Sequence, residues 1–199
     1  MRGVRGEKSH TVNDDNPNLD LDFTRHFAKP AVERAVPAPP PAGGDSYRAA
    51  HASHFVCYAK APSVATGADP QAPVIVLEDH DGSRRLLEKA IGLYGLPVRP
   101  AADVREFAIA LRKPPRPRLI LLDVGLPRAN GFQILTQLRL HPQTEAIPVV
   151  LVTARSDHAD VIRGLSLGAD GYLSKPLTVK ALRSVLDTVL QRPANPIHA

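Results

Sequence analysis

The chain has 199 residues, of which 43% are hydrophobic, one cysteine and a formal net charge of +5. The single cysteine excludes an internal disulfide, and no apolar stretch approaches the ~20 residues that a membrane-spanning helix needs. The charge excess is small and scattered, which is typical of a solvated surface. We therefore expect a cytoplasmic protein that contacts neither a membrane nor nucleic acid directly.

Residues 1–72 show no sustained hydrophobic period, and residues 36–44 are a valine followed by a run of proline, alanine and glycine that neither a helix nor a central strand accommodates. We expect this segment to be a largely disordered, proline-rich extension. Residues 193–199 are expected to be a short tail.

From residue 73 onward, apolar runs alternate with helical patterns. Strands are predicted over residues 74–78, 96–99, 119–123, 148–152 and 171–174, and helices over residues 82–94, 102–111, 131–140, 157–167 and 178–190. Runs rich in valine, isoleucine and leucine are typical of parallel strands buried on both faces. Gly95 and Gly168 are placed to end helices, and Thr178 to cap one. The pattern predicts one α/β domain over residues 73–192, a doubly wound five-stranded parallel sheet.

Polar residues follow the apolar runs where the strands end. In the flavodoxin-like order 2-1-3-4-5, the first and third strands are neighbours, which brings Asp123 close to the pair Glu78 and Asp79. Three clustered carboxylates need a cation, and Mg²⁺ prefers such oxygen ligands. A carboxylate can also attack phosphorus, and Lys175 and Thr153 are of the right type to balance charge on a phosphoryl group.

These motifs, in segments 74–79, 119–131, 149–154 and 168–176, resemble the receiver domain of two-component response regulators, including stand-alone chemotaxis-type receivers. The resemblance implies that Asp123 is the phosphoacceptor and that a histidine kinase or histidine phosphotransfer protein is the donor. It implies that Mg²⁺ is bound by Glu78, Asp79, Asp123 and the carbonyl of Gly125. The protein would then not be an enzyme acting on a separate substrate, since it would catalyse only its own phosphorylation and dephosphorylation.

The resemblance also assigns roles on the neighbouring strands. Thr153 and Lys175 would contact the phosphoryl group, Thr153 and Tyr172 would form the switch, and the bond from Lys175 to Pro176 would be cis. Gly125 and Arg155 are the residues best placed to set the lifetime of the phosphate. Signalling would proceed by phosphorylation-dependent binding of an output protein that the sequence does not identify, with a phosphorylation-dependent homodimer left open.

Two other readings are disfavoured, and a third stays open. A haloacid-dehalogenase-like phosphatase would need an aspartate where Gly125 stands, and the phosphate-binding glycine motifs of nucleotide enzymes do not occur. The alternative that stays open is a protein-interaction module of the same fold that signals without phosphorylation.

Overall fold

The computed structural model describes residues 56–57, 69, 71–154 and 158–190. The strands in this part of the chain are β1 (Val56–Cys57), β2 (Val74–Leu77), β3 (Val98–Ala101), β4 (Leu119–Asp123), β5 (Val149–Thr153) and β6 (Gly171–Ser174). The helices are α2 (Asp81–Leu93), α3 (Val104–Arg112), α4 (Gly131–Leu140), α5 (His158–Ser166) and α6 (Val179–Val189). None of these helices combines the length and hydropathy that crossing a bilayer requires.

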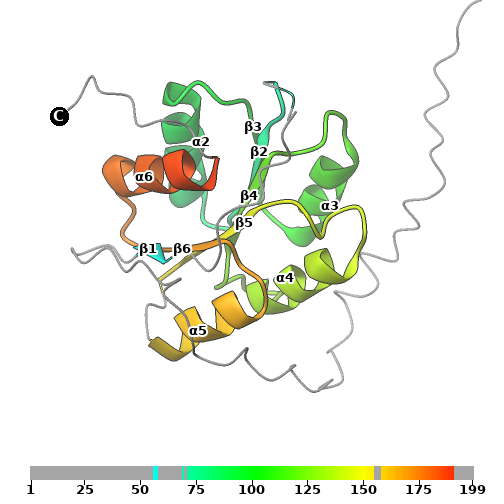
Figure 1. Cartoon of the computed structure of the whole chain (residues 1–199). Coiled ribbons are helices and arrows are strands. Elements are labelled where there is room, and N and C mark those ends of the chain that lie inside the picture. Colours follow the sequence, from blue (N-terminus) through cyan, green and yellow to red (C-terminus); the bar gives the residue numbers. More distant parts are fainter. Residues whose placement is uncertain (1–55, 58–68, 70, 155–157, 191–199) are drawn as a thin grey trace, which may run out of the picture.

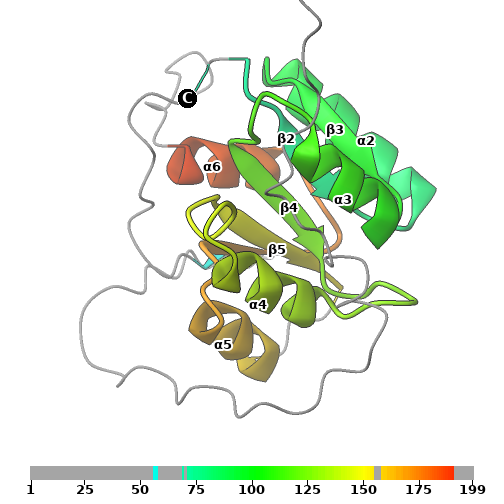
Figure 2. The ribbon, with the colours of Figure 1, turned by 90° about the vertical axis from the view of Figure 1, so that its right-hand side faces the viewer.

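The strands form one sheet in the order β1-β6-β5-β4-β2-β3. The pairs β3–β2, β2–β4, β4–β5 and β5–β6 are all parallel. Counted along the chain from β2, these five strands have the order 2-1-3-4-5, so the predicted five-stranded parallel sheet is confirmed. Figure 2 shows β4 and β5 side by side in its centre. The doubly wound arrangement places the carboxyl ends of β2 and β4 next to each other at one edge.

Strand β1 adds a sixth, antiparallel strand at the outer edge of β6, with Val56 opposite Leu173 and Cys57 opposite Tyr172. It lies in the segment 1–72, where we expected no regular structure. Two residues are too few to show a period, so this pairing is visible only as a tertiary contact with the sheet edge.

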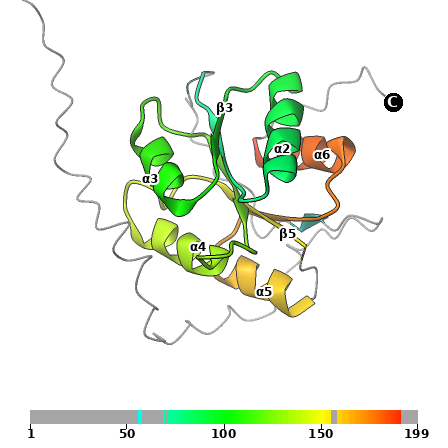
Figure 3. The same ribbon diagram turned by 180° about the vertical axis from the view of Figure 1, so that it is seen from behind.

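Two apolar cores lie on opposite faces of the sheet because side chains alternate along each strand. Ile75 and Leu77 pack with residues of α3, α4 and α5, whereas Val74 and Val76 pack with residues of α2 and α6. The same alternation continues in β4 and β5. Figures 1 and 3 show the two groups of helices on either side of the sheet. All five strands of the parallel sheet are thereby positioned between helices.

The ends of several helices and strands are determined by local backbone conformation and hydrogen bonds. Gly95 and Gly168 have positive φ values of 84° and 90°, which glycine adopts without strain, and both follow helices as predicted. Thr178 caps α6, accepting a hydrogen bond from the amide of Ala181 at 3.1 Å. The helix predicted over residues 131–140 matches α4, whereas several other predicted helix and strand ends differ by one or two residues, most clearly at β3, which begins at Val98. There, β3 includes Pro100, which an edge strand tolerates because one side of its backbone needs no ladder partner.

Arg139 joins three segments at the amino-terminal edge of β5 and β6. Its guanidinium donates to the carbonyl oxygens of Gly168 at 2.8 Å and Ile147 at 2.9 Å, and to Asp170 Oδ2 at 2.8 Å. The same Asp170 oxygen accepts from the amide of Val149 at 2.8 Å. One side chain therefore fixes the starts of β5 and β6 relative to each other.

We predict that Arg139→Ala lowers the free energy of unfolding by about 3 kcal/mol, because it removes a charged donor from the Asp170 carboxylate and from several carbonyls. Urea denaturation of the variant measures this loss. Arg112→Ala, which removes an exposed arginine from the end of α3, is the control and should change stability by less than about 0.5 kcal/mol. Equal stabilities of the two variants would show that the Arg139 network contributes nothing.

Candidate functional site

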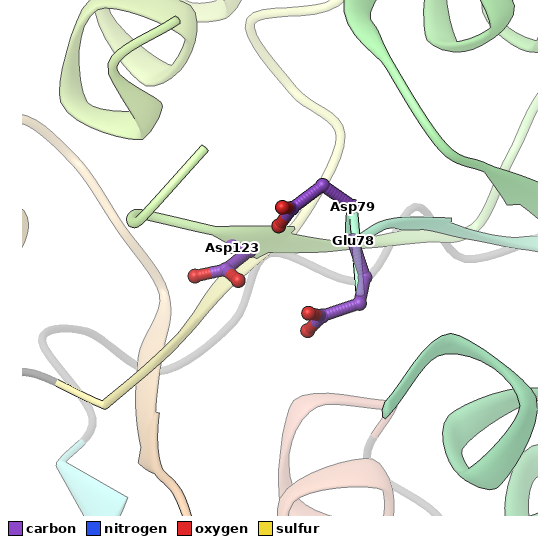
Figure 4. Close-up of side chains that lie close together, drawn as sticks. All are labelled: Glu78, Asp79 and Asp123. Carbon is purple, nitrogen blue, oxygen red and sulfur yellow. The ribbon is translucent and has the colours of Figure 1, made fainter. Parts of the chain in front are cut away.

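Three carboxylates meet at the carboxyl ends of β2 and β4. Glu78 and Asp79 directly follow β2, Asp123 ends β4, and the register that pairs Leu77 with Leu122 brings them level. One oxygen of each lies within 4.8 Å of the others. Figure 4 shows Asp79 reaching from the end of β2 toward Asp123. The cluster predicted from the strand order is therefore present.

The three carboxylates differ in their exposure to solvent. Glu78 and Asp123 are only 1% and 4% exposed, whereas Asp79 is exposed. Burying two carboxylates together is unfavourable unless a positive charge lies beside them. Two of the three carboxylates therefore lie inside the domain, and the third lies at its surface.

Lys175 supplies that positive charge from the end of β6. Its Nζ lies 2.8 Å from Asp123 Oδ2 and donates to Glu78 Oε1 at 2.9 Å. The backbone amide of Lys175 donates to the carbonyl of Thr153 at 2.8 Å, which continues the pairing of β6 with β5 beyond the last strand residue. The parallel register therefore delivers the ammonium to the carboxylates. The bond between Lys175 and Pro176 is cis, as predicted.

The charges of the site are not fully balanced. Burial raises the pKa of the Glu78 carboxyl, and the neighbouring Asp123 raises it further, against the opposing effect of Lys175. Burial lowers the pKa of the Lys175 ammonium, but its hydrogen bonds to Asp123 and Glu78 outweigh that effect, so its pKa lies above the usual value. The raised pKa of Glu78 therefore follows mainly from its burial, whereas the raised pKa of Lys175 follows from its hydrogen bonds to two carboxylates.

The residues present fit a divalent cation. Glu78 Oε2 is buried and lies 2.7 Å from Lys175 Nζ, so both oxygens of this carboxylate face the same ammonium. Asp79 presents a second carboxylate at the exposed side of the same cluster. Oxygen donors with surplus negative charge are the ligands that Mg²⁺ prefers.

The loop after β4 is shaped around Asp123 by two glycines. The amide of Gly125 donates to Asp123 Oδ1 at 2.8 Å, and Gly125 itself is exposed. A Cβ on Gly131 would lie 2.5 Å from the backbone oxygen of Asp123, so only glycine permits this approach of α4 to the strand end. From the sequence, Gly131 is predicted only as the start of a helix, and a glycine eight residues after a strand-end aspartate is the one signal of this close approach.

The proposed switch residues lie on β5, which neighbours β4, and on β6, which pairs with the other side of β5. Thr153 ends β5, is 1% exposed, and stands opposite Ser174 of β6. Tyr172 is fully buried in the core under α4 and α5. Arg155 lies outside the described residues, so its predicted effect on phosphate lifetime stays a prediction.

Comparison with known proteins identifies the family. The profile of the response regulator receiver domain matches residues 74–187, and the chain belongs to this family. A probable transcriptional regulator, ycf27 of Cyanophora paradoxa, is 37% identical over 123 residues, which are 62% of this chain and 50% of the relative. The chain spans about half the length of the curated relatives it matches.

Solved structures agree with this assignment. A putative response regulator from Chloroflexus aurantiacus superposes with a TM-score of 0.57 at 30% identity, covering 62% of this chain and 100% of that one. The Mn²⁺-bound form of response regulator Rcp1 has a TM-score of 0.53 at 27% identity, covering 62% of this chain and 99% of that one. The predicted family and fold are thereby confirmed.

The titration of Glu78 gives a test of the site without metal. Burial raises the pKa of this carboxyl, so the folded state holds its proton more tightly than the unfolded chain does. Stability should therefore fall as pH rises from the unfolded pKa near 4.5 through the higher folded pKa. Glu78→Gln cannot titrate, and we predict that it is more stable than the wild type at pH 7.

Urea denaturation across this pH range, with a chelator present, measures the difference. Glu88→Gln removes an exposed carboxylate of α2 and is the matched control, which should follow the wild-type curve. If the stability of Glu78→Gln changes with pH in parallel with that of the wild type, ionisation of the buried Glu78 carboxyl does not destabilise the folded state.

Proposed function

We propose that this receiver domain accepts a phosphoryl group on Asp123 from a phosphohistidine of a histidine kinase or phosphotransfer protein. The observation that carries the proposal is the placement of a buried aspartate beside both a lysine ammonium, 2.8 Å away, and an acidic pair. A carboxylate so placed is a nucleophile with its charge-balancing partners already in position.

The transfer needs no general base. An ionised oxygen of Asp123 forms the new bond to phosphorus while the bond from phosphorus to the donor imidazole nitrogen breaks, and the released nitrogen keeps the electron pair and takes a proton from solvent. Lys175 already contacts Asp123, so its ammonium is placed to move onto the phosphoryl oxygens. The domain would therefore catalyse its own phosphorylation and dephosphorylation.

Mg²⁺ would be held by Asp79, Asp123 and the carbonyl of Gly125, with Glu78 acting through water. When bound, the ion supplies charge neutralisation for the carboxylates and the phosphoryl oxygens. The exposed Asp79 and the grouping of three carboxylates beside one ammonium support this assignment. The structure of Rcp1 that matches this fold is a Mn²⁺-bound form, which is consistent with a divalent cation in the family.

Signalling would follow from the positions of Thr153 and Tyr172. Phosphate on Asp123 would draw the Thr153 hydroxyl toward it, because β4 and β5 are neighbours and both residues stand at their carboxyl ends. The space released would let Tyr172 change position and reshape the surface around α5, β6 and α6. A partner, or a second copy of the chain, would read this surface.

The curated relatives are named as transcriptional regulators, so the expectation that this protein makes no direct contact with nucleic acid has no support from them. The second candidate is a module of this fold that binds its partner without phosphorylation. Phosphorylation dependence of partner binding separates the two.

We predict that the full chain, given acetyl phosphate and Mg²⁺, gains one base-labile phosphate, and that Asp123→Asn abolishes the gain. The amide cannot attack as the carboxylate does. Intact mass measurement before and after mild base treatment detects the group. Asp69→Asn, an exposed carboxylate outside the site, should be labelled like the wild type. A phosphate retained in Asp123→Asn would place the nucleophile elsewhere.

A second prediction concerns Thr153. Thr153→Ala should accept phosphate within about threefold of the wild-type rate, since the hydroxyl is not the nucleophile, but should lose the conformational response. Amide exchange of β6 and α6 with and without phosphate measures that response, and Thr136→Ala on α4 is the control. A full response in Thr153→Ala would remove the threonine from the switch.

A further inference from the structure

Arg84 lies in the first turns of α2 and reaches back to the acidic pair. Its Nη1 donates to the carbonyl of Glu78 at 2.9 Å and to the carbonyl of Asp79 at 3.2 Å. The other end of the guanidinium forms an ion pair with Asp81 in the same helix. The side chain is only 17% exposed, so it lies against the turn that joins β2 to α2.

This turn carries two of the three carboxylates and needs to be held in place. The amide of Glu78 donates to the carbonyl of Ala101 at 3.1 Å, which anchors the turn on the side of β3. Asp79 is exposed, and within the described residues no hydrogen bond of its carboxylate is found, so its position follows from its backbone. One guanidinium nitrogen that binds two successive carbonyls fixes the orientation of the peptide groups on both sides of Asp79.

We propose that Arg84 is a positioning residue for the metal site, which holds the backbone of Glu78 and Asp79 so that their carboxylates face Asp123. The inference rests on the proposed function, because it assigns Arg84 a role in Mg²⁺ binding at that site. Residues that orient metal ligands in this indirect way are commonly worth a factor of about 10 to 100 in affinity.

The charge of Arg84 acts in the opposite direction. A guanidinium close to the cluster repels an incoming cation, so its removal would tighten Mg²⁺ binding if charge alone mattered. Its hydrogen bonds to the two carbonyls hold the ligands in place, so its removal would weaken binding if positioning dominates. We expect positioning to dominate, because the ion pair with Asp81 already offsets much of the guanidinium charge. The two effects differ in sign, so one measurement separates them.

The experiment compares Arg84→Ala and Arg84→Lys with Arg85→Ala in the full chain. Arg85 is exposed on the same helix, so its removal causes the same change in net charge without touching the turn. Calorimetric titration with MgCl₂ gives the affinity. The phosphorylation rate with acetyl phosphate at rising Mg²⁺ gives the half-saturating concentration and the maximal rate separately.

We expect Arg84→Ala to weaken Mg²⁺ binding about tenfold and to raise the half-saturating concentration similarly, with the maximal rate changed less than twofold. Arg84→Lys should lie between Arg84→Ala and the wild type, and Arg85→Ala should match the wild type. Affinity in Arg84→Ala equal to or tighter than the wild type would overturn the inference. So would a lower maximal rate at unchanged affinity, which would indicate a different role.

Two controls keep this result interpretable. If thermal unfolding shows that Arg84→Ala does not fold, the comparison of Arg84→Lys with Arg85→Ala decides, and equal affinities of those two overturn the inference. If the wild-type chain itself neither binds Mg²⁺ nor accepts phosphate, the proposed function fails. A wild type that does both, beside an unaffected Arg84→Ala, overturns only the role of Arg84.

Discussion

The ion pairs between the Lys175 ammonium and the buried carboxylates of Glu78 and Asp123 are the interaction on which the site depends. Two carboxylates inside a folded domain would be unfavourable alone, and one ammonium 2.7–2.9 Å from both makes them tolerable. The compensation is incomplete, because Asp79 adds a third negative group within 4.8 Å. The site thus retains a surplus of negative charge that favours a cation and, once Asp123 is modified, a redistribution of its partners.

The parallel sheet makes this arrangement possible. Strands of matched register end level with one another, so residues far apart in the chain, such as Glu78, Asp123 and Lys175, arrive at a common edge. Arg139 fixes the opposite ends of β5 and β6 through carbonyl and carboxylate contacts. Gly131 lets α4 start directly against the backbone of Asp123. The chemistry at one edge therefore depends on contacts made across the whole domain.

The strands and the carboxylate cluster were predictable because both follow from local pattern. Apolar runs such as residues 119–122 are buried on both faces, and the polar residue that ends each run is forced to the sheet edge. The exact start of β3 was not predictable, since an edge strand that contains Pro100 has a weak pattern.

Contacts made through backbone groups could not be predicted from the sequence either. Arg84 bonds to the carbonyls of Glu78 and Asp79, and a backbone carbonyl has no residue-type signature. Strand β1 pairs by the same kind of backbone contact with β6. Such interactions depend on the three-dimensional path of the chain, whereas charges and apolar periods follow directly from the residue types. The carboxylates could therefore be found from the sequence, but not the residue that holds their backbone.

The most direct measurement is the chemical location of the phosphate. Borohydride reduction of the phosphorylated chain converts an aspartyl phosphate to homoserine, and mass spectrometry of the resulting peptides then identifies the modified position. If the ion-paired carboxylate at the end of β4 is the acceptor, homoserine appears at position 123 and only when Mg²⁺ is present during phosphorylation. Conversion at Glu78, Asp79 or any other carboxylate, with Asp123 unchanged, would contradict the assignment of the site.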